Sequence, residues 1–100
     1  MGDRPKIANL LDEIADSVDA GDYRFSNHAR QRMAERGVDP PEVRHVLRTG
    51  WHEARKDQWQ EAYQAWNYAI RGSTVDNREV RVVVTFEGSL LVVTVIDLEE

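Results

Sequence analysis

One stretch of the sequence places a histidine beside two arginines. His28, Arg32 and Arg36 are four residues apart, so a helix would carry them on one side. An imidazole exchanges protons near neutral pH, and guanidinium groups bind phosphate oxygens in pairs. The spacing therefore predicts an acid or base beside a phosphate-binding site. The alternative is a solvated face on which the arginines pair with Glu35 or with acids of the preceding segment.

A second set of cations lies in the C-terminal half. Arg81 interrupts an alternating run of valines, so its side chain leaves the strand on the opposite face. There it could stabilise negative charge developing on a phosphate, or simply protect a sheet edge from pairing with another chain. Arg71 is a second candidate phosphate ligand. Aromatic residues between Trp59 and Tyr68 follow Lys56, a pattern that suits base stacking beside phosphate contacts and equally suits core packing.

Several common chemistries lack their sequence signals. The chain has no cysteine, and its three histidines show no short ligand spacing such as HxH, so no metal site is predicted. The glycine-rich and GxSxG motifs of nucleotide-binding proteins and hydrolases are also absent. We therefore expect neither a metal nor an organic cofactor.

Three helices are predicted to hold the first candidate residues in place. Apolar residues recur at helical spacing over residues 6–19, and Gly21 provides a helix end. After an extended link at residues 23–25, Ser26 can cap a second helix that stops at Gly37. The run Asp39-Pro40-Pro41-Glu42 predicts the start of a third helix, which Gly50 ends.

The rest of the chain is predicted to form a sheet. Strands are expected near Trp51–Lys56 and Ala65–Arg71, with a helix over residues 54–65 as the alternative. The strongest signal is a hairpin of Val80–Phe86 with Leu90–Ile96, whose second strand is apolar on both faces and should lie inside the sheet. We therefore predict one α+β domain over residues 1–100, with about three helices on one face of an antiparallel sheet of three to four strands.

Composition limits the setting in which such a domain works. The net charge is −5, so any polyanion site must be local, and cations concentrate between Arg24 and Arg55. No apolar run reaches the length of a membrane helix, and the N-terminus does not resemble a signal peptide. A cytoplasmic protein without a membrane partner is expected.

The sequence resembles a known group in several short motifs. The motifs Phe25-Ser26-Asn27-His28-Ala29, Arg32-Met33 and Glu35-Arg36-Gly37-Val38 look like the start of a bacterial domain family of unassigned function. That family is similar to toxins of the RelE-like superfamily. The chain also resembles MqsR-type mRNA interferases from Val18-Asp19-Ala20-Gly21 through Lys56, Trp66 and Arg71 into the final hairpin.

The resemblance implies a RelE-like fold and metal-independent RNA cleavage, in which a ribose 2′-hydroxyl attacks the adjacent phosphate. Lys56 matches a functional lysine of the interferases. Asn67 and Arg81 stand where they have a glutamine and a tyrosine. Ile96 stands where they have a further functional lysine, and its side chain can neither move a proton nor bind phosphate.

Two functions follow as hypotheses. In the first, the protein is a toxin-like endoribonuclease with RNA as substrate and a cognate antitoxin as partner. The residues assigned to catalysis are His28, Lys56, Tyr68 and Arg81, and those assigned to substrate binding are Arg32, Arg36, Asn67 and Arg71. In the second, the protein is an inactive relative whose aromatic strip at residues 59–66 binds an antitoxin or a second copy of the chain.

Overall fold

The helices begin and end at the capping signals of the sequence. The computed structural model describes residues 4–99 and contains α1 (Leu10–Asp19), α2 (Asn27–Arg36), α3 (Pro40–Thr49) and a 3-10 turn, η1 (Ala54–Lys56). Ser26 caps α2, and Gly37 ends it at a φ of 65°, where glycine is favoured. Asp39 and Glu42 form the predicted capping box of α3. The predicted caps of α2 and α3 are confirmed, whereas α1 begins at Leu10, later than expected.

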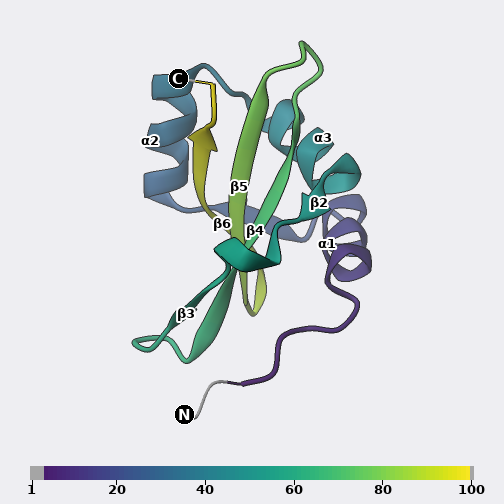
Figure 1. Cartoon of the computed structure of the whole chain (residues 1–100), viewed down its shortest axis with the longest axis vertical. Coiled ribbons are helices and arrows are strands. Elements are labelled where there is room, and N and C mark those ends of the chain that lie inside the picture. Colours follow the sequence, from purple (N-terminus) through teal and green to yellow (C-terminus); the bar gives the residue numbers. More distant parts are fainter. Residues whose placement is uncertain (1–3, 100) are drawn as a thin grey trace.

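A six-stranded sheet forms the centre of the fold (Figure 1). Its strands are β1 (Tyr23–Phe25), β2 (Trp51–His52), β3 (Gln58–Gln60), β4 (Ala65–Ser73), β5 (Glu79–Glu87) and β6 (Ser89–Asp97). Their order is β1-β6-β5-β4-β2, and β3 pairs with β4 to extend the sheet at one end. The hairpin of β5 and β6 is confirmed, and β6 lies inside the sheet as predicted.

Two expectations about the sheet were wrong. It has six strands instead of three to four, and it is mixed because β1 runs parallel to β6. The link at residues 23–25 is extended as expected and also joins the sheet, which three residues are too few to indicate through a periodicity. The predicted strand at residues 51–56 is only β2 followed by η1, and the helical alternative for residues 54–65 is wrong as well.

The two faces of the sheet have different surroundings. All three helices bury side chains in one apolar cluster with the inward residues of the strands, among them Ile70, Val82 and Val92. The other face is not covered by α1, α2 or α3. It is called the open face below. Its residues include Asn67, Arg71, Arg81 and Ile96, together with the η1 turn that crosses it (Figure 1). None of the helices within residues 4–99 is long and apolar enough to span a membrane.

Two local features shape the open face. A register shift in the β5–β6 pairing makes Val83 partner Thr94 while Val84 partners Val92, which leaves Val93 as an extra residue. Consequently Val93 and Thr94 both line a hollow on the open face. At the other edge, Gly50 lets the chain turn close to β4, because a Cβ there would lie 2.6 Å from the carbonyl oxygen of Arg71. This approach brings β2 and η1 onto the sheet.

Candidate functional site

A fully buried carboxylate lies at the centre of the open face. The side chain of Glu53, just after β2, has no exposed surface. Its Oε1 accepts a 2.8 Å hydrogen bond from Nε of Arg81, and its Oε2 accepts 3.3 Å bonds from Arg71 and Arg55. Arg71 and Arg81 are direct partners on β4 and β5, and such like charges repel unless an anion lies between them. Glu53 supplies that anion.

This arrangement fixes the charge state of Glu53. The hydrogen bond from Arg81 is the largest influence and lowers the pKa of the Glu53 carboxyl below its ordinary value, against the opposing effect of burial. Arg71 also donates a 3.0 Å hydrogen bond from Nε to Glu79, which lowers the pKa of Glu79. Both carboxylates are therefore ionised at neutral pH.

The η1 turn is fastened at both ends, and Lys56 projects from it. Glu53 anchors the start of the turn, and Asp57, whose side chain is also fully buried, anchors its end. Asp57 accepts hydrogen bonds from the backbone N–H of Ala69 at 2.9 Å and pairs with Lys6 at 2.9 Å and His52 at 2.7 Å. Lys56 itself is exposed and has no ion pair within residues 4–99. The anchored turn therefore fixes the backbone of Lys56, whose ammonium has no ion pair with another residue of 4–99.

A hollow of about 320 Å³ brings together the positions that the resemblance to interferases selects. Lys56, Asn67, Arg81 and Ile96 all line it, although they come from η1, β4, β5 and β6. Arg81 donates from Nε to Glu53, and its terminal nitrogens have no hydrogen bond to another described residue. The side chain of Asn67 also has no hydrogen bond to another described residue. The hollow therefore offers two cations and an amide to an anion.

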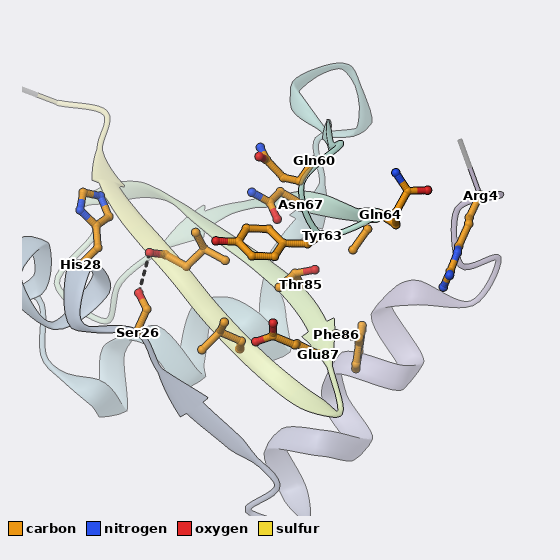
Figure 2. A pocket seen from close by; sticks show the side chains of 13 residues that line it. Arg4, Ser26, His28, Gln60, Tyr63, Gln64, Asn67, Thr85, Phe86 and Glu87 are labelled. Atoms are coloured by element: carbon orange, nitrogen blue, oxygen red, sulfur yellow. Dashed lines mark hydrogen bonds between the residues drawn. The ribbon is translucent and has the colours of Figure 1, made fainter. Parts of the chain in front are cut away.

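A larger neighbouring hollow, of about 550 Å³, contains His28. It shares Asn67 and Val93 with the smaller hollow, so the two lie next to each other. Figure 2 shows His28 at one end and Tyr63 with Asn67 on the other side. Ser26 places His28 there, because its backbone N–H and its hydroxyl donate to the carbonyl oxygens of Val92 and Val93 at the irregular part of β6.

The remaining predicted residues lie outside the two hollows. Tyr68 is buried in the core on the helix side, where its hydroxyl accepts a hydrogen bond from the backbone of Ile7. Strand alternation explains this placement, because the neighbouring Asn67 faces the opposite side. Arg32 pairs with Glu35, as the solvated-face alternative predicted. Arg36 lies one turn further along α2 and is half-buried.

Sequence reasoning placed Arg71 and Arg81 in a site but did not find their anchor, Glu53. The available signal was the pair of arginines itself, since two cations facing each other on paired strands require a nearby carboxylate. The sequence does not reveal the register of β4 and β5, so it could not indicate which acid lies between the two arginines. No group of three or more potential metal ligands occurs among residues 4–99.

Comparison with known proteins gives one family. The model of a family described as a domain of unknown function, DUF4258, matches residues 25–97. The chain belongs to the DUF4258 family. The DUF4258 match runs from the end of β1 through β6, so it includes every residue that lines the smaller hollow. No curated protein and no solved structure matches the chain significantly. The predicted membership in an unassigned family is thus confirmed, while the relation to RelE-like toxins stays a prediction.

Proposed function

We propose that this DUF4258 protein is a toxin-like, metal-independent endoribonuclease that cleaves RNA on the open face of its sheet. One observation carries the proposal: the four positions to which the interferase resemblance assigns a function line a single hollow. They are separated by up to 40 residues in the sequence and come from four different elements. If the resemblance were due to chance, these four positions would not be expected to line the same hollow.

The chemistry follows from the groups at the hollow. The ribose 2′-oxygen attacks the adjacent phosphorus while its proton passes to a base, and the 5′-oxygen leaves with a proton from an acid. The terminal nitrogens of Arg81 and the ammonium of Lys56 stabilise the additional negative charge on the phosphate oxygens. Asn67 donates a further hydrogen bond. The products are a 2′,3′-cyclic phosphate and a 5′-hydroxyl.

His28 is assigned one of these two proton transfers, as general base or as general acid, and solvent water exchanges the other proton. Ile96 stands where the interferases have a lysine and cannot transfer a proton, so that role must come from another residue of the open face. His28 is the only imidazole among the described residues that line the two hollows, and its side chain has no partner within residues 4–99. Its place beside the smaller hollow supports this assignment.

A cleavage assay tests the proposal. Purified protein is incubated with single-stranded RNA in the presence of EDTA, and the product ends are identified. We expect fragments with 2′,3′-cyclic phosphate ends, no cleavage of DNA of the same sequence, and a loss of about 100-fold or more in rate for His28→Ala. His45→Ala, which changes a histidine of α3 outside both hollows, should cleave like the wild type. Intact RNA with the wild-type protein would refute the proposal.

The replacement of a functional lysine by Ile96 favours a second candidate function. Ile96 is 38% exposed and lines the smaller hollow with Val83 and Val93, so apolar side chains form part of its wall. In that case the protein is an inactive relative of the toxins that binds an antitoxin or a second copy of itself. Expression that is tolerated by the host, combined with intact RNA in the cleavage assay and a stable complex in light scattering, would favour this function.

A further inference from the structure

The larger hollow contains an exposed aromatic ring that the proposed cleavage chemistry does not use. Tyr63, in the turn between β3 and β4, is 73% exposed and lines this hollow. Figure 2 shows its ring near the side chains of Gln60 and Asn67. An exposed aromatic ring beside a hollow offers a face on which a flat aromatic ligand can stack.

The turn that carries Tyr63 is bridged by its own hydrogen bonds. The carboxylate of Glu61 accepts hydrogen bonds from the indole of Trp59 and from the amide of Gln64, each at 2.9 Å. The backbone N–H of Tyr63 donates to the carbonyl oxygen of Gln60 at 3.2 Å. Gln64 has a φ of 53°, a conformation that residues other than glycine rarely adopt. These hydrogen bonds position the backbone of Tyr63 beside the hollow.

Two unpaired amides lie on the same side of the hollow. Neither Gln60 nor Asn67 makes a side-chain hydrogen bond to another described residue, and both line the hollow. Each amide can donate and accept, which matches the mixed donors and acceptors on the edge of a nucleobase. The volume of about 550 Å³ lies in the range of small-molecule sites.

We propose that this hollow is a nucleobase-binding site, in which Tyr63 stacks on a base whose edge is contacted by Gln60 and Asn67. Because Asn67 also lines the smaller hollow, the base belongs to a nucleotide next to the phosphate held by Arg81 and Lys56. The ligand is single-stranded RNA, whose bases are free to stack. The inference rests on the proposed function for the identity of the ligand and adds the group that it recognises beside the phosphate.

A binding experiment tests this site without relying on catalysis. A short single-stranded RNA that is 2′-O-methylated throughout, and so cannot be cleaved, is compared with the same chain carrying abasic sites at every position. Both have the same phosphates. We expect the wild type to bind the base-containing chain about tenfold more tightly, since one stacked base contributes roughly that factor. Tyr63→Leu should bind both chains alike, and Tyr63→Phe should keep the preference.

Trp51→Leu is the matched control. Trp51 is also an exposed aromatic residue, 52% exposed in the edge strand β2, but it lines neither hollow. Its replacement should leave the preference for bases unchanged. Equal binding of the two chains by the wild type, or a preference that survives in Tyr63→Leu, would overturn the inference. Cleavage that proceeds normally in Tyr63→Leu together with equal binding by the wild type would leave the ribonuclease standing without a base site. Binding that depends on Tyr63, in a protein that leaves RNA intact, would support the base site and refute the ribonuclease.

Discussion

Lys56→Ala is expected to slow RNA cleavage by about 100-fold while leaving the melting temperature unchanged. Removing one group that stabilises the charge of a transition state typically has an effect of this size. The stability of the fold should not change, because the Lys56 side chain is exposed and makes no ion pair or hydrogen bond within residues 4–99. Single-turnover cleavage rates and thermal unfolding of the same preparations measure the two quantities.

Arg55→Ala provides the control for Lys56. Arg55 lies in the same η1 turn, is also exposed and lines neither hollow. Its 3.3 Å hydrogen bond to Glu53 is lost in the variant, but Glu53 keeps its hydrogen bonds from Arg71 and Arg81. Its removal subtracts the same unit of charge from the same part of the surface, so we expect a change of no more than a few-fold. An equal loss in Arg55→Ala and Lys56→Ala would mean that general attraction of the polyanion explains the effect, and would contradict a direct phosphate contact.

Glu53→Gln is expected to lower the free energy of unfolding by about 2 kcal/mol. The substitution keeps the shape of the side chain but removes the carboxylate that Arg71 and Arg81 share, and Arg71 keeps only its ion pair with Glu79. Breaking a fully buried ion pair lowers the free energy of unfolding by more than this. We expect a smaller loss here because both arginines keep part of their surface in water. Urea unfolding measures the change. Glu79→Gln, which removes a more exposed partner of Arg71, should destabilise the protein clearly less.

The effect of Glu53→Gln should also depend on pH. The pKa of Glu53 is lower in the folded protein than its ordinary value of 4.5, chiefly because of the hydrogen bond from Arg81. Stabilisation by such a group is fully present above its ordinary pKa and is lost as the pH falls through the pKa of the folded state. The difference in stability between wild type and Glu53→Gln should therefore be constant near neutrality and shrink below about pH 4.5. A difference that grows on acidification would contradict the assigned interaction.

The elements with strong local signals could be predicted from the sequence. The capping box at Asp39 and Glu42 depends on neighbouring residues alone, and the hairpin of β5 and β6 follows from alternation and a short turn. The parallel pairing of β1 with β6 could not be predicted, because it joins segments more than 60 residues apart and leaves no pattern in three residues. The irregular pairing at Val93 determines which side chains of β6 lie on the open face. It could not be predicted either, because no local pattern indicates it.

The candidate site could be predicted only in part. Strand alternation indicates Arg81, and the resemblance indicates Lys56 and Asn67, but their convergence depends on the strand register of the fold. Tyr68 was selected with them, but its place in the strand turns it into the core. Glu53 was not selected because its role depends on two arginines that meet only in the fold. Contacts between distant segments, which no local pattern encodes, account for each of these differences.

The location of the RNA site is the central claim, and an NMR titration tests it most directly. Isotope-labelled protein is titrated with an RNA hexamer that is 2′-O-methylated throughout and so remains intact. We predict that the largest shift changes occur at the Nε–H group of Arg81, at the side-chain amide of Asn67 and at backbone amides around Lys56. Signals of α1 and α3, on the opposite side of the sheet, should stay in place. Changes confined to those helices, or none up to millimolar RNA, would contradict an RNA site on the open face.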